Sequence, residues 1–311
     1  MGVQLGDLIP RRKIGLKDLS GKALAIDAYN ALYQFLSIIR GPDGRPLMDK
    51  QGRVTSHLSG LLYRTANLVE VGILPAYVFD GEPPRLKRLE ITRREEVKRV
   101  ATVKYRKALE EGRMEDVRTY AQATARLKDY MVSDAERLLS LMGVPWVQAP
   151  SEGEAQAAHM AARGDVYAVA SQDYDSLLFG APVLARNIAI TGRRKLPRKN
   201  VYVEVEPEMV ELQTALKQLK IDRARLVYLG ILVGTDYNPD GIKGVGPKTA
   251  LKLVTQYGSL QEILEQVEDR GSFPVDPEEL VKLFLEPKVI DRYKLRWEAP
   301  DIEGVVAFLC G

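Results

Sequence analysis

Short runs of apolar, β-forming residues alternate with longer amphipathic stretches along much of the chain. The runs that predict strands are Lys22–Ile26, Pro75–Phe79, Pro145–Val147, Val166–Ser171, Pro182–Ala185 and Val201–Val205. Apolar residues recur at helical spacing in Ala31–Ile39, Ser56–Val71, Asp116–Leu141 and Glu152–Ala162. Apolar strands that alternate with helices are typical of parallel sheets covered on both faces. The pattern therefore predicts an α/β fold with a mainly parallel central sheet flanked by helices.

Two regions depart from this alternation. Residues 82–131 form a long, charged, helical pattern between two predicted strands. From Glu206 onward the pattern is almost wholly helical, with loop signals at 238–241 and 271–277. We interpret the chain as one domain, 1–311, made of an N-terminal part (1–81), a helical insertion (82–131), an internal part (132–236) and a helical C-terminal part (237–311).

Few residues are available for soft-metal chemistry. Cys310 is the only cysteine, and His57 and His159 are the only histidines, which excludes an intrachain disulfide and a cysteine-rich zinc site. A metal ion must therefore be held by oxygen, which favours Mg²⁺ or Mn²⁺. The longest apolar stretch, around Leu226–Val233, is too short to span a bilayer, and Met1–Pro10 lacks the pattern of a signal peptide. We expect no membrane partner and a location inside the cell.

The net charge of +3 hides an uneven distribution. Arg85–Lys107 holds ten Lys and Arg residues against three Glu residues, a local balance of +7, so the rest of the chain sums to −4. A basic segment on a slightly acidic body predicts an anionic partner that touches selected surfaces.

Acidic residues stand where the predicted strands end. They are Asp27, Asp80, Asp173 and Asp175, with Glu152 and Glu154 shortly after the Pro145–Val147 run. Open parallel sheets bind ligands at the carboxyl ends of their strands, so we expect these side chains to converge there. A dense group of carboxylates repels itself unless cations occupy it.

Each acid also has an ordinary structural interpretation. An Asp after a strand is often a turn former or a helix cap. Ser151-Glu152-Gly153-Glu154 fits a capping box, with Ser151 as the N-cap and Glu154 at the third helical position. That alternative does not explain why Asp173-Tyr174-Asp175 repeats the acid-x-acid spacing at the next strand end.

The repeated spacing favours a two-metal site. Two hard divalent ions roughly 4 Å apart can activate a water molecule, orient a phosphate and stabilise the leaving oxygen. Several carboxylates are needed to hold them, and neither histidine nor cysteine is required. We therefore predict two Mg²⁺ ions as cofactors, with Mn²⁺ able to substitute, and phosphate chemistry as the function.

The acidic motifs and their order resemble those of the flap endonuclease family of structure-specific 5′ nucleases, in its archaeal type. The matching segments extend over nearly the whole chain. They are Ala25–Ala28, Tyr77–Pro84, Ala149–Ala155, Ser171–Asp175, Gly234–Tyr237 and Gly241–Lys248.

The resemblance implies a ligand set and a reaction. It assigns Asp27, Asp80, Glu152 and Glu154 to one metal ion, and Asp173 and Asp175 to the second, with Asp236 assisting through water. The implied reaction is phosphodiester hydrolysis in 5′ flap, double-flap or nicked DNA, which yields a 5′-phosphate and a 3′-hydroxyl in Okazaki fragment maturation and DNA repair.

The basic segment after Pro84 gains a role from the same resemblance. Lys87 and Arg94 lie seven residues apart, so they share a helix face that Lys98 extends. The family forms a helical gateway here for the 5′ flap, and Lys87 and Arg94 match its catalytic contacts to the scissile phosphate. Tyr33 matches an aromatic residue that stacks a DNA base. A solvated charged helix, and a core position for Tyr33, are the structural alternatives.

A second set of residues is expected to hold duplex DNA. The Gly244–Ala250 segment predicts a tight turn into a helix with Pro247 at its first position, where Gly244, Gly246 and Lys248 can bind a phosphate backbone. The resemblance adds a K⁺ ion at this helix–hairpin–helix element, and matches Arg64 to a duplex contact. The basic residues of 193–199 form either a DNA-binding loop or a plain exposed turn.

Alternatives within and beyond the family stay open. One is a 5′-3′ exonuclease or gap nuclease of the same family, a second is a non-catalytic DNA-junction-binding protein, and a third is an RNA-processing nuclease. The family implies a sliding clamp as partner, but the chain ends at Gly311, before the expected clamp-docking tail. We expect a monomer in the cytoplasm of an archaeal cell, or in the nucleus if the source is eukaryotic.

Overall fold

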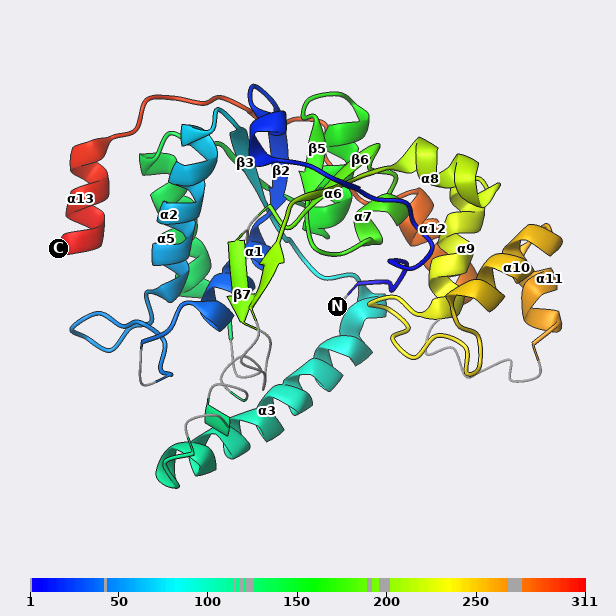
Figure 1. Cartoon of the computed structure of the whole chain (residues 1–311), viewed down its shortest axis with the longest axis horizontal. Coiled ribbons are helices and arrows are strands. Elements are labelled where there is room, and N and C mark those ends of the chain that lie inside the picture. The colour runs from blue at the N-terminus through cyan, green and yellow to red at the C-terminus, as the bar shows by residue number, and fades with distance from the viewer. Residues whose placement is uncertain are drawn as a thin grey trace.

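A seven-stranded, mainly parallel sheet forms the centre of the computed structural model (Figure 1), in the order β1-β9-β6-β5-β2-β3-β4. The described residues are 2–41, 44–113, 116–117, 120, 126–188, 192–195, 202–267 and 276–311. β4, β3, β2, β5 and β6 are parallel neighbours, and β9 is antiparallel to β6 and β1. The predicted fold class is confirmed. The strands are β1 (Arg12–Lys13), β2 (Ala23–Asp27), β3 (Leu74–Phe79), β4 (Trp146–Gln148), β5 (Ala168–Ala170), β6 (Val183–Arg186) and β9 (Glu208–Glu211).

Helices cover both faces of this sheet. Side chains alternate across a strand, so Leu24 and Ile26 of β2 pack into one hydrophobic cluster while Ala25 packs into the other. The first cluster includes α1 (Ala28–Ile38), α2 (Ser56–Glu70) and α5 (Asp129–Leu141). The second includes α6 (Gly153–Ala162), α7 (Asp175–Leu178), α8 (Leu212–Leu219) and α9 (Arg223–Val233). None of the described helices has both the length and the apolar character needed to cross a membrane.

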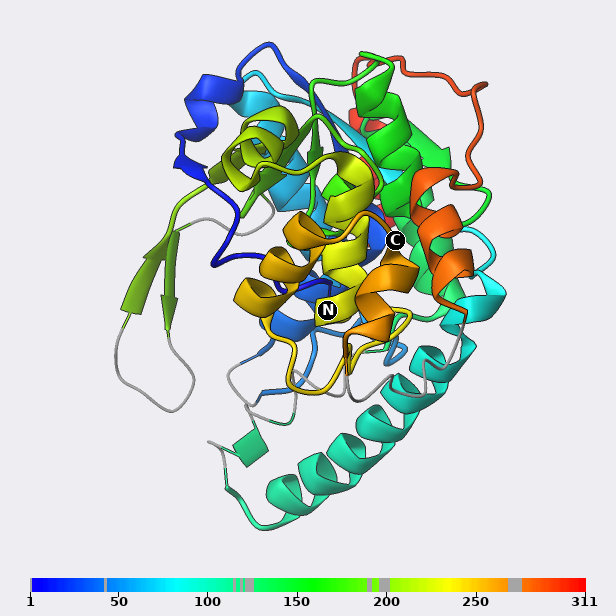
Figure 2. The same ribbon diagram turned by 90° about the vertical axis from the view of Figure 1, so that its right-hand side faces the viewer.

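The charged insertion contains one long helix that projects from the sheet. A 3₁₀ turn at Arg85–Lys87 leads into α3 (Arg88–Glu110), which extends away from the body in Figures 1 and 2. The helix predicted over Asp116–Leu141 is only partly confirmed. Its described C-terminal portion, α5, begins at Asp129 because Lys128 has extended backbone angles (φ −107°, ψ 155°).

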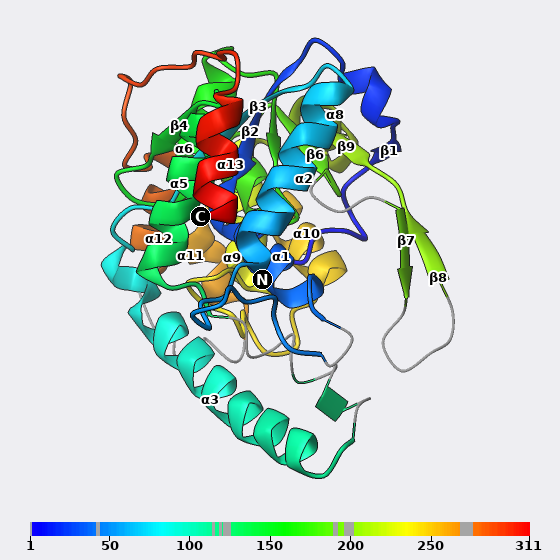
Figure 3. The same cartoon turned by 90° about the vertical axis from the view of Figure 1, so that its left-hand side faces the viewer.

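The C-terminal half is less helical than its sequence pattern predicts. Helices α10 (Pro247–Gln256), α11 (Leu260–Glu265) and α12 (Pro277–Leu285) follow α9, and α13 (Ile302–Cys310) packs on α5 (Figure 3). However, β9 precedes α8, and residues 286–301 have no regular secondary structure. The predicted strand at 201–205 is present as β8 (Tyr202–Val205), but it pairs with β7 (Gly192–Lys195) in a separate ribbon.

Residues 286–301 form a strap that links α12 to α13 across the sheet. Gln156 of α6 is fully buried and holds the backbone of Ile290 in both directions, through Nε2 to the carbonyl (2.9 Å) and Oε1 from the amide (2.8 Å). The indole Nε1 of Trp297 donates to the carbonyl of Pro75 at 2.7 Å. The strap satisfies its backbone through such contacts, which a helical pattern does not predict.

We predict that Gln156→Leu lowers the free energy of unfolding by about 1–3 kcal/mol, because it leaves the partly buried backbone groups of Ile290 without their partner. Urea unfolding measures this change. The matched control is Gln218→Leu on the exposed side of α8, which should stay within about 0.5 kcal/mol of the parent. Equal effects of the two substitutions would contradict the role of Gln156.

Candidate active site

The strand-end acids lie along one edge of the sheet. Asp27 is the last residue of β2, and Asp80 follows directly after β3. Asp173 and Asp175 follow β5, and Glu152 and Glu154 follow β4 at the start of α6. Because β4, β3, β2 and β5 are parallel neighbours, their carboxyl ends meet at this edge. Asp236, which the resemblance alone suggested, joins them from the turn after α9, where it lies 3.9 Å from the ammonium nitrogen of Lys87.

The start of α6 tests the capping-box interpretation of Glu152 and Glu154. The N-cap of α6 is Glu152, and its own side chain makes no capping hydrogen bond. Ser151 Oγ donates to the carbonyl of Glu82 at 3.0 Å, while Glu154 Oε1 accepts from Ser171 Oγ at 2.7 Å. Glu154 therefore faces the end of β5, and the capping box that the sequence allowed is absent.

The close approach of Gly153 to Asp80 explains why a glycine separates Glu152 from Glu154. Its backbone amide donates to Asp80 Oδ1 at 2.7 Å, and a Cβ at this position would lie 2.7 Å from the same oxygen. Real Cβ atoms essentially never lie this close to a non-bonded atom, so a side chain at this position would force the Asp80 carboxylate to shift. The glutamate pair is thereby joined to the strand-end aspartate.

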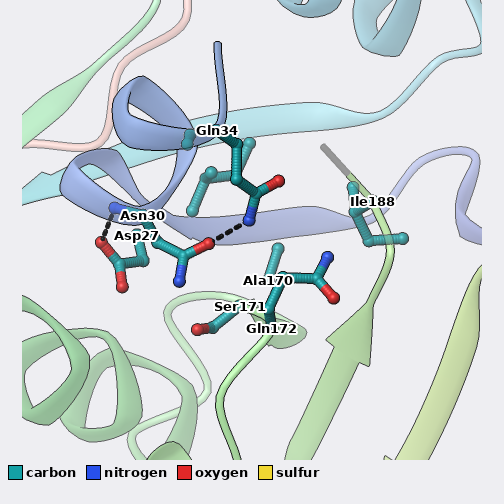
Figure 4. Close-up of a pocket in the computed structure, with 9 residues that line it drawn as sticks. Asp27, Asn30, Gln34, Ala170, Ser171, Gln172 and Ile188 are labelled. Atoms are coloured by element: carbon teal, nitrogen blue, oxygen red, sulfur yellow. Dashed lines mark hydrogen bonds between the residues drawn. The ribbon is translucent and has the colours of Figure 1, made fainter. Parts of the chain in front are cut away.

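Backbone amides and one asparagine hold the remaining aspartates. Asp27 caps α1 by accepting from the Asn30 amide at 2.9 Å (Figure 4). Asn30 Nδ2 donates to Asp173 Oδ2 at 3.1 Å. The amides of Gly2 and Val3 donate to Asp173 and Asp175 at 2.9 and 2.7 Å. Sequence reasoning missed Asn30 and the N-terminal segment. Asn30 could have been found as the third residue after a capping aspartate, whereas nothing local indicates the contact of Gly2 with Asp173.

The insertion contributes two cations to the same group. Lys87 Nζ lies 2.6 Å from Glu152 Oε2, and Arg94 Nη2 lies 2.7 Å from Asp236 Oδ2. The Lys87 side chain is only 15% exposed, so this is a largely buried contact. The base of α3 is therefore joined to the acidic edge, which excludes the interpretation of these two residues as part of a wholly solvated helix face.

Burial is the largest cause of the perturbed acidities in this group, and neighbouring carboxylates add to it. The pKa of Asp27 is raised to about 8, with Asp80 as the next contribution. Burial followed by the nearby Asp236 raises the pKa of Asp175 to about 7. Burial followed by the nearby Glu152 raises the pKa of Asp80 to about 6. Burial followed by two nearby aspartates raises the pKa of Glu154 well above its usual value. The cluster therefore resists carrying all its negative charge without further cations.

The ion pairs between the insertion and the acidic edge favour the charged forms of both partners. Burial opposes the charged form of Lys87, but Glu152 and Asp80 outweigh it and raise the lysine pKa. Burial would also raise the pKa of Asp236, yet cations that include Arg94 and Lys87 hold it below its usual value. These ion pairs offset part of the repulsion.

The donor chemistry fits hard divalent ions. In the described part of the chain, no three Asp, Glu, His or Cys side chains converge closely enough to ligate an ion as they stand. The contacts above explain this, because the carboxylates turn toward Lys87, Arg94 and backbone amides. The buried hydroxyl of Tyr237 has no hydrogen-bond partner among the described residues, and Glu152 and Asp175 contribute, after burial, to the raised pKa of this phenol. Carboxylate oxygens with an orphaned hydroxyl suit a hydrated Mg²⁺ or Mn²⁺ ion.

The two residues predicted to contact the flap lie on facing positions of α1 and α3. Tyr33 is half-buried on α1, and Lys98 of α3 lies over its ring, 4.7 Å from the centroid. Tyr33 is outside the two hydrophobic core clusters, contrary to the core alternative.

Arg64, the predicted duplex contact on α2, donates to the carbonyl of Ile188, and burial lowers its pKa. Its contact with DNA stays a prediction.

The predicted duplex anchor has the expected local geometry. Gly246 is the N-cap of α10 and Pro247 its first residue, as the sequence predicted. Gly244 has φ +81°, which favours glycine, but Gly246 has φ −83° and open space where a Cβ would stand. Lys248 is exposed beside them. Internal packing does not require Gly246, which is exposed at the start of α10, where a helix N-terminus can bind an anion. In the second basic loop, the side chains of 193–195 and all of 198–199 lie outside what the structure describes.

Family models match three segments of the chain. They are an XPG N-terminal domain at residues 1–101, an XPG I-region at 143–236, and a SAM-like helix-hairpin-helix tandem at 239–292. The first two carry the acidic edge, and the third includes the α10 turn.

Full-length comparisons agree. The chain is 59% identical to "Flap endonuclease 1" of Hyperthermus butylicus, covering 99% of this chain and 89% of that protein. It is 57% identical to "Flap endonuclease 1" of Pyrococcus furiosus, covering 100% and 90%. The solved structure of flap endonuclease-1 from Methanococcus jannaschii superposes with a TM-score of 0.76 at 44% identity, covering 99% of this chain and 92% of that one. Identity at this level over nearly the whole length shows that the chain belongs to the flap endonuclease 1 family.

Proposed function

We propose that this chain is a structure-selective 5′ flap endonuclease that hydrolyses DNA phosphodiesters with two Mg²⁺ ions, for which Mn²⁺ can substitute. The observation that carries the proposal is the acidic edge itself, where six carboxylates at or after strand ends are joined by Asp236 and contacted by Lys87 and Arg94. Family membership supports the substrate, because the named relatives are flap endonucleases.

The seven carboxylates would divide between the two ions. Asp27, Asp80, Glu152 and Glu154 would hold one, partly through water, and Asp173 and Asp175 would hold the other with Asp236. Such ions would supply an activated water and stabilise charge on the attacking and leaving oxygens. The raised pKa values support the proposal, because a bound dication offsets the repulsion that keeps protons on the cluster.

Lys87 and Arg94 would exchange partners during the reaction. Their contacts with Glu152 and Asp236 show that both can reach the acidic edge. With those carboxylates neutralised by bound dications, Lys87 and Arg94 would be free to contact the scissile phosphate. There they would stabilise the negative charge that develops on its oxygens.

The remaining predicted contacts complete a DNA path. Tyr33 and Lys98 would meet the 5′ flap between α1 and α3, while the α10 turn would bind the backbone of the duplex, with K⁺ as a further proposed ligand. Arg64 would contact the duplex on the α2 side. The single-domain organisation, the monomeric state, the cytoplasmic location, the sliding-clamp partner and the role in Okazaki fragment maturation and repair stay predictions.

The direct test is cleavage of an end-labelled double-flap DNA with and without Mg²⁺. We expect one discrete product at the flap junction that requires the metal. Preferential cleavage of gapped or nicked duplex would instead favour the exonuclease alternative. Tight junction binding without any cleavage would favour the non-catalytic one.

Removal of a single ligand should separate chemistry from binding. We predict that Asp175→Ala lowers the cleavage rate by roughly 100-fold or more, since even partners outside the ligand shell cost 10–100-fold. Binding of the flap substrate in Ca²⁺ should change little. Asp240→Ala is the control, because Asp240 lies four residues beyond Asp236 and is 84% exposed. Near-parental turnover of Asp175→Ala in Mg²⁺ would refute the ligand assignment.

The two cations should affect rate more than affinity. We expect Lys87→Ala and Arg94→Ala each to reduce the single-turnover rate by about 100- to 1000-fold, the usual effect of losing one donor to transition-state charge. Arg99→Ala on the same helix is the matched control, since its side chain is 69% exposed and pairs with Glu96. A weaker DNA affinity with an unchanged single-turnover rate would show that Lys87 and Arg94 only bind.

The raised acidities predict how stability and metal affinity depend on pH. An acid whose pKa is higher in the folded than in the unfolded state stabilises the fold at low pH, and this stability is lost as pH rises through the folded value. Without metal, the melting temperature should therefore fall between about pH 4 and about pH 8, the value for Asp27.

Added Mg²⁺ should reverse this trend, and its apparent affinity should increase toward pH 8, because binding must displace protons from Asp27, Asp175 and Asp80. Thermal melts in chelator and in Mg²⁺ measure both effects. Asp27→Asn should flatten the pH dependence, whereas exposed Asp240→Asn should not. A Mg²⁺ affinity independent of pH over this range would contradict the account.

A further inference from the structure

The loop that carries Asp173 and Asp175 is held from one side by Arg186. This arginine ends β6, which is the parallel neighbour of β5 and pairs with it at Ala170 and Ala185. Its guanidinium therefore stands beside the point where the chain leaves β5. Nε donates to the carbonyl of Gln172 at 3.2 Å, and Nη1 donates to the hydroxyl of Tyr174 at 2.7 Å.

These two contacts bracket Asp173 in the sequence. The carbonyl of Gln172 precedes it, and the phenol of Tyr174 separates it from Asp175. Tyr174 is 5% exposed, and the Arg186 guanidinium carbon lies 4.3 Å from its ring centroid. The Arg186 guanidinium thus holds the backbone carbonyl that precedes Asp173 and the side chain that follows it. Among the described contacts, Arg186 makes none with the Asp173 carboxylate itself.

The guanidinium is itself held by the next strand. Glu208 of β9 is the cross-strand partner of Arg186, and its Oε2 lies 3.2 Å from Nη1. Arg11 lies 3.6 Å from Oε1 of the same glutamate and 3.4 Å from the Tyr174 hydroxyl. Arg186 and Glu208 are less than 20% exposed, at 17% and 19%. The sheet therefore provides a rigid support for the loop.

We propose that Arg186 is a positioning residue that fixes the relative placement of Asp173 and Asp175 for the second metal ion. This inference rests on the proposed two-metal function of the same edge. Arg186 contacts neither substrate nor ion in this role; it acts through Gln172 and Tyr174.

The geometry requires an arginine rather than any cation. A guanidinium presents donors in a fixed planar fork, so one side chain can reach the Gln172 carbonyl and the Tyr174 hydroxyl together. A lysine ammonium is a point donor on a flexible stem. Arg186→Lys therefore keeps the charge beside Glu208 while losing the fork, which isolates positioning from electrostatics.

The test measures metal binding by the full chain without DNA, using calorimetric titration of Mn²⁺. We expect Arg186→Lys to weaken binding of one ion by about 10-fold, the usual effect of disturbing a ligand's support. Tyr174→Phe, which keeps the Gln172 contact, should give a smaller loss. Arg163→Lys is the matched control, because Arg163 pairs with Asp165 and Asp291 on the strap side of α6 and should leave binding unchanged.

Two further measurements separate positioning from general destabilisation. The Mg²⁺ concentration for half-maximal single-turnover cleavage should rise about 10-fold in Arg186→Lys, with most of the rate recovered at saturating metal. Amide hydrogen exchange in metal-free protein should accelerate at residues 172–176 and not across the sheet.

Specific outcomes overturn the inference. If the parent binds Mn²⁺ and Arg186→Lys binds it equally well, Arg186 does not position the pair. The same holds if the rate falls without a shift in metal dependence, or if exchange accelerates throughout the sheet. Failure of the parent itself to bind Mn²⁺ would remove the proposed two-metal function, and this inference with it.

Discussion

Repulsion among carboxylates at one edge of the sheet is the constraint on which the rest of the site depends. Parallel strands bring Asp27, Asp80, Asp173 and Asp175 to the same edge, and burial there strengthens their repulsion. The fold can keep such a cluster only if each carboxylate finds a donor or a cation. Backbone amides, Asn30, Ser171 and the base of α3 meet that need in the structure described.

This compensation links distant parts of the chain to one another. The amides of Gly2 and Val3 reach across the sequence to the β5 loop, and Lys87 and Arg94 bring the insertion onto the acidic edge. In the proposed mechanism, the cations that hold carboxylates in the absence of metal would hold phosphate in its presence. If the proposed function holds, the position of α3 and the charge state of the cluster would therefore be coupled.

The sequence predicted where the strand-end acids lie, because their placement follows from chain order. It did not predict contacts between residues that are far apart in the sequence. Strand-end placement was enough for Asp27 and Asp80, because the strands that precede them are plainly apolar. Asp236 follows a helix, so only the family motif identified it. Glu154 looked like a capping residue, since local sequence cannot show that Ser171 is its partner. Nothing near Arg186 indicates its role, because the loop that it supports becomes its neighbour only through the parallel pairing of β5 and β6.

The central claim is that the acidic edge is a two-metal site which the protein's own cations hold together until ions bind. The most direct measurement is a crystal structure grown with Mn²⁺, with the ions located by anomalous scattering. The account predicts two peaks about 4 Å apart among the seven carboxylates, with Lys87 Nζ withdrawn from Glu152. A single peak, or none, with the Lys87–Glu152 contact intact at saturating Mn²⁺ would contradict it.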